Sequence, residues 1–462
     1  MSVEPIGFLT LVLALISLAF GYHVCAKIFV FMSLLGSAAA VTIGSFSIQP
    51  AHLLLGFVVL CTLTRSREAA AALSLFIPPR PGFWLGCMIL YGIIGALLLP
   101  RIFSGMTQIL PIGSSAYGKT DGFVPLGPVS GNLSQSVYLI ADLLCFLVVS
   151  SIASTRSGFY TIASAIITFS VGNVFFAIMD IITYSTGTQY LLDFIRNAQY
   201  VFHLTEEASG LKRIAGSFTE ASSFAHATLG IVGFTGTTWL CGRFRFWSGC
   251  LFLVSLGLLV LSTSSTGLAG APPMLLILYI TAVGRCVNAK HNSRAIFVVL
   301  ATPLVITAIV QAIMLDSQLF AAISDYLSSL VFNKSSTLSG LERASWNRAA
   351  MENFFDSFGL GVGLGTARTS SFMLAVLSNV GIPGLVFYTL FAITCFGRRS
   401  PSITTFTSDI QLAARNACLG LIIADVISGA LVDQGLTFYT LAAMSAVNVE
   451  GLDPVAKRQY VS

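Results

Sequence analysis

The chain has 462 residues, of which 55% are hydrophobic and only 9% charged, and its mean hydropathy is +0.86. A soluble domain carries about 25% charged residues, so this chain has too few to form a water-facing surface. The formal net charge of +5 is small, and no run of basic residues indicates nucleic acid as a partner. We therefore expect an all-α, polytopic transmembrane bundle, with residues 1–462 forming a single membrane domain.

Long apolar runs recur along the whole chain, and about 20 residues are needed to cross the hydrocarbon core. We expect thirteen spans, or twelve, because the runs 50–64 and 271–284 are short. Pro272 and Pro273 favour a helix start at the second of these. The runs lie at about 5–22, 25–44, 50–64, 82–100, 136–154, 158–184, 222–241, 247–264, 271–284, 295–314, 372–396, 410–431 and 434–448. The nine cysteines lie in apolar runs or short basic connections, so no disulfide framework is expected.

Lysine and arginine concentrate in the short connections on one side of this arrangement, which predicts that this side is cytoplasmic. The N-terminus is then outside and the C-terminus cytoplasmic. Three long loops lie outside, at about 101–135, 185–221 and 315–371, and we expect them to contain helices. The last two are the candidate active site. The basic residues are Arg65, Arg67, Arg80, Arg243, Arg245, Arg285, Lys290, Arg294, Arg398, Arg399, Lys457 and Arg458.

The second long loop ends in a polar segment that begins at Lys212 and Arg213. Ser217 and Glu220 have the spacing of a capping box, which predicts a helix start there. Glu220 would then lie in the first turn, where the helix dipole favours an anion. In the alternative interpretation, Glu220 lies beside Arg213 as a base or as a group that orients the arginine.

The third long loop contains a second capping-box pattern, at Ser339 and Glu342, and a helix of about 18 residues is expected to follow it. Arg348 shares an apolar face of that helix, so we expect it to be buried against a partner or an anion. Glu352, four residues on, is the simplest partner. Arg343 lies on a different face and is expected to be solvated.

A glycine-rich segment follows at residue 359, with Gly361, Gly363 and Gly365 at alternate positions and Arg368 close behind. Glycines allow close backbone approach, and arginines bind phosphates bidentately, so the segment is a candidate diphosphate site. Both motif loops carry balanced charge, which favours local recognition over long-range attraction of an anion.

These motifs resemble the O-antigen polymerase and ligase superfamily. The resemblance rests on Arg213-x-x-Gly216-x-Phe218-x-Glu220, on GLGVGLGTARTSSFMLAVLSNVGIPGLVF, and on the ten-residue spacing between Arg348 and Gly359. It covers roughly residues 200–396 in motif and the whole chain in architecture.

The resemblance implies a membrane glycosyltransferase of the bacterial cytoplasmic membrane. It would polymerise undecaprenyl-diphosphate-linked oligosaccharides into exopolysaccharide or O-antigen at the outer face, with inversion. Membrane lipid, a chain-length regulator and a flippase are the other partners this suggests, without a cofactor or metal. Catalytic roles fall to Arg348, Arg213 and Glu220; substrate binding falls to Arg343, Arg368, Lys212, Gly361, Gly363 and Gly365.

Two other functions remain open. A ligase of this superfamily typically has a functional histidine in its large external loop, and residues 315–371 contain none. The serines from Ser262 lack the basic residue that often follows them in the family. A flippase or transporter is favoured by acids within spans, namely Asp142, Asp180 and Asp425. In the alternative interpretation, Asp180 is exposed to water at the outer end of its span. Repeated halves with broken helices are not visible in the sequence. His203 and His226 are expected to be structural.

Overall fold

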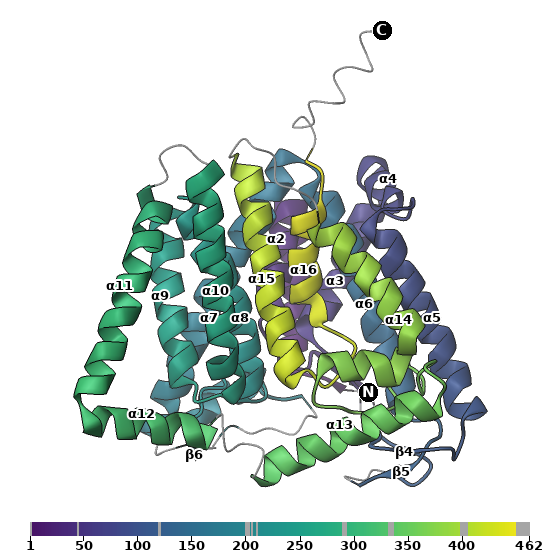
Figure 1. Cartoon of the computed structure of the whole chain (residues 1–462). Coiled ribbons are helices and arrows are strands. Elements are labelled where there is room, and N and C mark those ends of the chain that lie inside the picture. The colour runs from purple at the N-terminus through teal and green to yellow at the C-terminus, as the bar shows by residue number, and fades with distance from the viewer. Residues whose placement is uncertain are drawn as a thin grey trace.

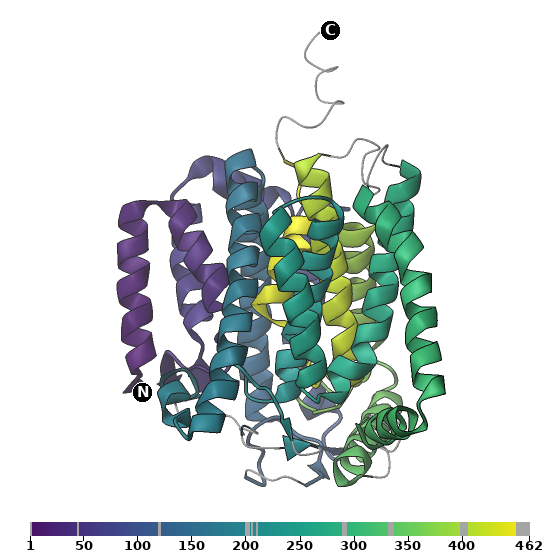
Figure 2. The ribbon, with the colours of Figure 1, turned by 90° about the vertical axis from the view of Figure 1, so that its left-hand side faces the viewer.

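The computed structural model describes residues 2–43, 46–118, 122–198, 204, 207–208, 211–288, 293–330, 337–397 and 405–449. The chain is 75% helical, with 17 helices in the described residues, and this confirms the all-α class. Figures 1 and 2 show most of these helices side by side in one bundle. The long helices are apolar over most of their length, as a bilayer requires of helices whose backbone groups must bond internally.

The helices of the first half are α1 (Pro5–Phe20), α2 (Tyr22–Met32), α3 (Pro50–Leu63), α4 (Ser66–Ser74), α5 (Pro81–Ile102), α6 (Ser130–Ala153), α7 (Arg156–Thr186) and the 3-10 helix η1 (Gln189–Ile195). The second half contains α8 (Ala221–Leu240), α9 (Arg245–Leu261), α10 (Ser265–Asn288), α11 (Ser293–Leu315), α12 (Ser317–Leu330), α13 (Leu338–Asp356), α14 (Phe372–Phe396), α15 (Phe406–Ser428) and α16 (Gly435–Ala446).

The strands are short and antiparallel. They are β1 (Ser2–Val3), β2 (Val41–Ile43) and β3 (Phe46–Ile48) in one sheet of order β1-β2-β3, the pair β4 (Gln108–Ile109) and β5 (Val124–Pro125), and the pair β6 (Glu207–Ala208) and β7 (Leu211–Lys212).

A helix occupies each of the thirteen predicted runs. Seven described helices are long and apolar enough to cross a membrane, namely α5, α6, α7, α10, α11, α14 and α15, and four more are shorter and apolar. The count of twelve or thirteen spans therefore stays a prediction. Two details were wrong. The second run is helical only to Met32 and then turns into β2, and Pro272 and Pro273 lie inside α10, which begins at Ser265.

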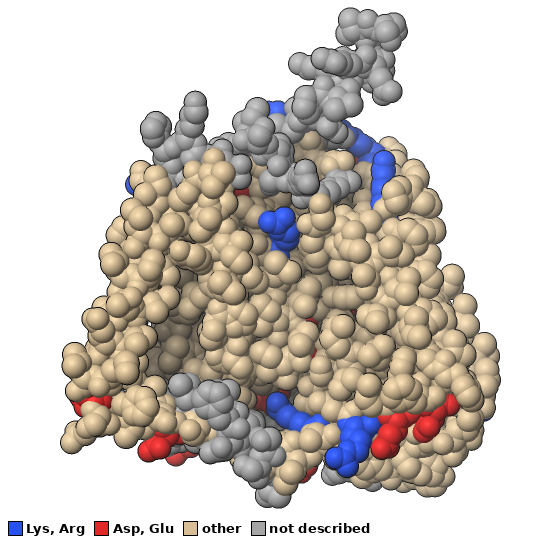
Figure 3. Space-filling view, in the orientation of Figure 1, with Lys and Arg blue, Asp and Glu red and all other residues tan. Residues whose placement is uncertain are grey.

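The bundle has two different ends. At one end, which we call the loop end, Figure 1 places α12, α13, β4, β5, β6 and the N-terminus. The opposite end carries α4 and is called the basic end, because the described short connections with arginines lie there. On the face in Figure 3, charged side chains gather at the two ends, and the wall between them is almost entirely uncharged. The three long loops thus share one end, as predicted; Lys290, Arg398, Arg399, Lys457 and Arg458 fall outside the described residues.

The long loops are not uniformly helical. The third contains α12 and α13, as the prediction of helical loops requires. The first contains the β4–β5 hairpin, and the second contains η1 followed by the β6–β7 pair. Apolar periodicity gave no sign of these two-residue strands.

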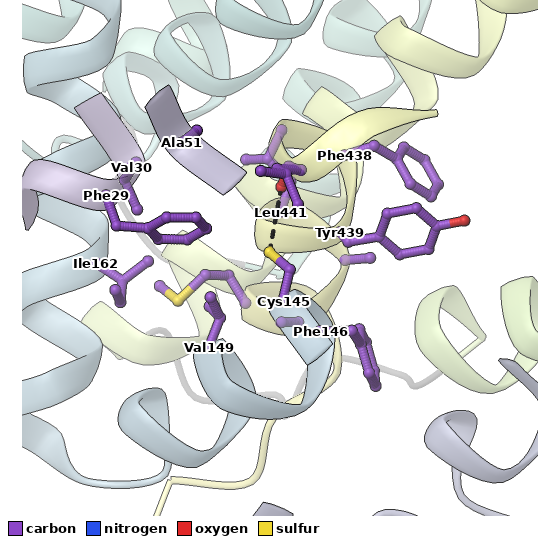
Figure 4. Close-up of a cluster of buried hydrophobic side chains, with 14 of the residues drawn as sticks. Phe29, Val30, Ala51, Cys145, Phe146, Val149, Ile162, Phe438, Tyr439 and Leu441 are labelled. Carbon is purple, nitrogen blue, oxygen red and sulfur yellow. Dashed lines mark hydrogen bonds between the residues drawn. The ribbon is translucent and has the colours of Figure 1, made fainter. Parts of the chain in front are cut away.

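The core of the bundle surrounds α16. With 12 residues it is about 18 Å long, too short to cross a membrane alone. Phe438 and Tyr439 are fully buried, and Figure 4 shows them in one cluster with Phe146 of α6 and Phe29 of α2. Cys145 Sγ lies 3.4 Å from Thr440 Oγ1 in the same cluster. None of the nine cysteines, all of which lie in the described residues, forms a disulfide.

Candidate functional site at the loop end

The glycine-rich segment packs against a break in α14. The break lies at Gly381, whose φ of 59° and ψ of −161° are not helical. The backbone of the glycine-rich segment forms hydrogen bonds with residues on both sides of the break. Ile382 N donates to Gly359 O at 2.8 Å, and Val362 N donates to Ser378 O at 2.7 Å. A helix broken inside a membrane bundle exposes unpaired backbone groups, and the segment supplies their partners.

Asn379, just before the break, fixes the segment further. Its Oδ1 accepts hydrogen bonds from the backbone N–H groups of Thr366 and Ala367, both at 3.0 Å. Its Nδ2 donates to Ala367 O at 2.9 Å. Asn379 itself is 1% exposed, so all these groups are satisfied within the protein.

The alternating glycines have a packing reason. A Cβ on Gly361 would lie 2.6 Å from Asn379 O, one on Gly363 would lie 2.8 Å from Pro100, and one on Gly365 would lie 2.3 Å from Gly131 O. Residues 361–367 are all buried. The glycines are therefore needed for contact between the segment and the helices. Their predicted role in binding diphosphate or sugar stays a prediction.

This packing predicts a large effect for Gly365→Ala. The new Cβ would overlap backbone, and the φ of +73° is strained for any residue with a side chain. We expect loss of most folded protein, measured by the yield of monodisperse protein in detergent. Gly257→Ala is the matched control, because a Cβ there meets nothing within 4 Å, and alanine stabilises an exposed helix by up to about 1 kcal/mol. Equal yields of the two variants would contradict this account of the segment.

Helix α13 holds the predicted catalytic arginine at the surface. The helix begins at Leu338 with Thr337 as its N-cap, whose side chain accepts from Gly340 N, so the predicted Ser339–Glu342 capping box is wrong. Its buried face carries Ala350 and Asn353, and Thr107 Oγ1 donates to Asn353 Oδ1 at 3.0 Å.

Arg348 lies on the opposite, exposed face of α13, together with Leu341, Met351 and Phe355. The prediction that this apolar face is buried was wrong, because Ala350 and Asn353 face inward instead. Glu352 is exposed as well, and among the described residues no ion pair joins Arg348 to an acid. The structure thus leaves the Arg348 guanidinium available to a ligand.

Arg368 is placed beside the same helix. Its guanidinium carbon lies 5.1 Å from the centre of the Trp346 ring, a cation–π contact. Asn347 Oδ1, next to Arg348 in sequence, accepts from Ser370 N at 2.9 Å. Arg368 is exposed, as is Arg348, so both arginines are exposed at the loop end, although Trp346 and Arg348 lie on different faces of α13. Arg343 of α13 is half-buried, against the expectation that it is solvated.

The second long loop is tied to α7 by Asp180. This carboxylate is 0% exposed and pairs with Arg196 Nη2 at 2.8 Å and with Lys212 Nζ at 2.9 Å. Its Oδ2 accepts from the backbone N–H of Ala215 at 2.8 Å and of Gly216 at 3.1 Å. The suggestion that Asp180 is wet was wrong.

Lys212 is therefore placed in the fold by an ion pair. Burial lowers the pKa of its ammonium group, and the carboxylate of Asp180 opposes that shift. Its predicted contact with substrate stays a prediction.

Glu220 is the N-cap residue of α8, and its side chain makes no cap hydrogen bond. Its Oε1 accepts from Ser222 Oγ instead. The predicted Ser217–Glu220 capping box is wrong, since Ser217 Oγ donates to Leu34 O at 2.8 Å. Glu220 and Arg213 are both half-buried at the start of α8, at the loop end.

A buried polar chain lies one and a half turns further along α8. His226 Nε2 lies 2.9 Å from Asp425 Oδ1 of α15. Gln434 Nε2 donates to Asp425 Oδ2 at 2.9 Å, and Tyr388 OH donates to Gln434 Oε1 at 2.8 Å. We call these four residues the His226 chain. The sequence marked Asp425 only as an acid within a span and His226 as structural, because their pairing depends on how α8 packs on α15.

The end of α15 connects this chain to the glycine-rich segment. Ser371 Oγ donates to Val426 O at 3.0 Å, and Thr369 N donates to Ala430 O at 3.4 Å. The serine-rich turn before α10 reaches the same place, where Thr266 Oγ1 donates to Ser428 Oγ at 3.0 Å. The glycine-rich segment and the start of α10 thus both contact the end of α15.

Within the described residues, no group of three or more histidine, cysteine, aspartate or glutamate side chains could hold a metal ion. The chemistry available there is that of the exposed arginines at the loop end and of a histidine–aspartate pair further along α8 and α15. No known family model matches this chain, and no curated protein matches it in sequence.

Proposed function

We propose that this protein polymerises undecaprenyl-diphosphate-linked oligosaccharide repeat units at the outer face of the bacterial cytoplasmic membrane. The observation that carries the proposal is the exposure of Arg348 on α13 and of Arg368 in the glycine-rich segment that contacts this helix, at the loop end of an apolar bundle. Arginine suits a diphosphate because its planar fork binds two oxygens and stays charged. A lipid-linked diphosphate lies at the membrane surface, at the level expected for these side chains. The motif resemblance supports the same reaction.

In the proposed reaction the growing chain, on its lipid diphosphate, is the donor. A hydroxyl of a new lipid-linked repeat unit attacks the anomeric carbon of the donor from the opposite face. The bond from that carbon to the phosphate oxygen breaks, and undecaprenyl diphosphate leaves. Arg348 and Arg368 stabilise the charge that builds on the leaving diphosphate, an electrostatic contribution that is often the largest in an enzyme.

The other half of the proposed site is the start of α8. Arg213 and Glu220 lie there, half-buried, and we assign them to the acceptor substrate. The reaction brings two lipid-linked substrates together. Two arginine-bearing segments at one end of the bundle can bind one substrate each. The attacking hydroxyl also needs a base to take its proton.

A flippase for the lipid-linked unit is the second candidate. It is favoured by the broken helix α14, a feature of transporter binding sites, and by Asp142, which is fully buried beside Asp433. No broken helix was expected from the sequence. A ligase, which transfers finished glycan to an acceptor, is the third candidate.

The lipid-linked product that accumulates on deletion of the gene separates these functions. We expect single repeat units on the outer face, because they can be flipped but not joined. Repeat units confined to the cytoplasmic face would indicate a flippase, and long chains left on the lipid carrier would indicate a ligase. Either of those results would overturn the proposed polymerase.

A further inference from the structure

The geometry of the His226 chain suggests a role in proton transfer. His226 Nε2 faces Asp425, and no described residue forms a hydrogen bond with the other ring nitrogen, Nδ1. The His226 side chain is 25% exposed and that of Asp425 is 11% exposed. A histidine that has one nitrogen on a carboxylate and the other free is arranged to accept a proton.

The carboxylate of Asp425 has more partners than the ion pair between α8 and α15 alone would give it. Both of its oxygens have partners, since His226 lies at Oδ1 and Gln434 at Oδ2. Gln434 is itself fixed, because its Oε1 accepts from Tyr388 OH. Counted over the whole residue, Asp425, Gln434 and Tyr388 are each less than 9% exposed, and they come from α15, the turn before α16, and α14. The hydrogen bonds among Tyr388, Gln434 and Asp425 fix the direction of the Asp425 carboxylate, which faces His226.

The position of His226 also fits the proposed site. It lies on α8 six residues after Glu220, and Asp425 precedes Val426, to which Ser371 Oγ donates. The pair thus lies between the acceptor segment at the start of α8 and the end of the glycine-rich segment. A histidine that only joins two helices would have no reason to lie between them with an open nitrogen.

Resting on the glycosyl transfer proposed above, we propose that His226 is the base that removes the proton from the attacking hydroxyl, with Asp425 as a positioning residue. The hydroxyl oxygen bonds to the anomeric carbon while its proton moves to His226 Nδ1. The electron pair of the broken bond leaves with the diphosphate. The carboxylate of Asp425 stabilises the imidazolium, which loses its proton to water after the product departs. Glu220, bonded by Ser222, orients groups at the start of α8.

The test measures polymer formation by purified protein in lipid vesicles with purified lipid-linked repeat unit. We expect His226→Ala to lower kcat at least about 100-fold with KM within a few-fold, since a general base contributes about 10²- to 10⁴-fold. Added imidazole should restore part of the activity of this variant, which a purely structural histidine would not show.

His23→Gln is the matched control, because this histidine lies at the start of α2, where Nε2 is 3.3 Å from Ser157 Oγ, and it takes no part in the proposed site. If His226→Ala does not yield folded protein, His226→Gln decides, since glutamine can still bond Asp425 but cannot act as a base. Full activity of that variant, or a folded His226→Ala that imidazole does not rescue, would overturn the role of His226. An inactive wild type would instead overturn the polymerase itself.

Discussion

Arg348→Ala is expected to abolish polymer formation while leaving the amount of folded protein unchanged. Arg348 is exposed on α13, and no ion pair to a described acid would be lost. Removing it takes away stabilisation of the leaving diphosphate, which we expect to cost about 3 kcal/mol or more, or at least about 100-fold in kcat. The measurement is polymer formed per folded protein from purified lipid-linked repeat unit.

Arg348→Lys separates a bidentate contact from a simple charge. Lysine keeps the charge but lacks the planar fork, so we expect it to restore little activity. Arg101→Ala is the matched control, because Arg101 is another exposed arginine, in the last turn of α5 near the loop end. Its partner among the described residues is Leu97 O of its own helix. If lysine works as well as arginine, or if exchanging Arg348 and Glu352 restores activity, the diphosphate contact is wrong.

The sequence predicted the positions of the long helices well, because apolar runs report directly on what a bilayer accepts. It missed the break at Gly381, which depends on partners that come from residues 359–363. It also missed α4 and α12, since neither is an apolar run of membrane length. The sequence also placed the end of α2 too late, because hydropathy does not distinguish a buried turn after Met32 from a continued helix.

The candidate site was predicted by residue type rather than by geometry. The helical wheel found two faces of α13 correctly, but periodicity does not say which face is inward. The buried hydrogen bond from Thr107 to Asn353 shows which face of α13 is inward, and Arg348 lies on the opposite, outward face. The partners of Asp180 and Asp425 come from residues far along the chain or on other helices, and a single sequence does not reveal such pairs.

Asp180→Ala is expected to destabilise the protein by about 3–5 kcal/mol, because it leaves the buried charges of Arg196 and Lys212 without a partner. It also leaves the backbone N–H groups of Ala215 and Gly216 unbonded beneath the start of α8. The measurement is thermal unfolding in detergent. Asp193→Ala is the matched control, since this acid is exposed in η1, and surface changes stay within about 0.5 kcal/mol.

Replacing the unpaired Arg196 and Lys212 as well should recover part of the stability that Asp180→Ala removes. In the triple change Asp180→Ala, Arg196→Met and Lys212→Met, the buried ions are replaced by apolar groups, which is often neutral in stability. We expect this variant to unfold at a higher temperature than Asp180→Ala alone. If it also forms polymer, Lys212 serves the fold through Asp180 and does not bind substrate. If Asp180→Ala is as stable as wild type, the ion pairs do not hold the second long loop, and the position of Arg213 must have another cause.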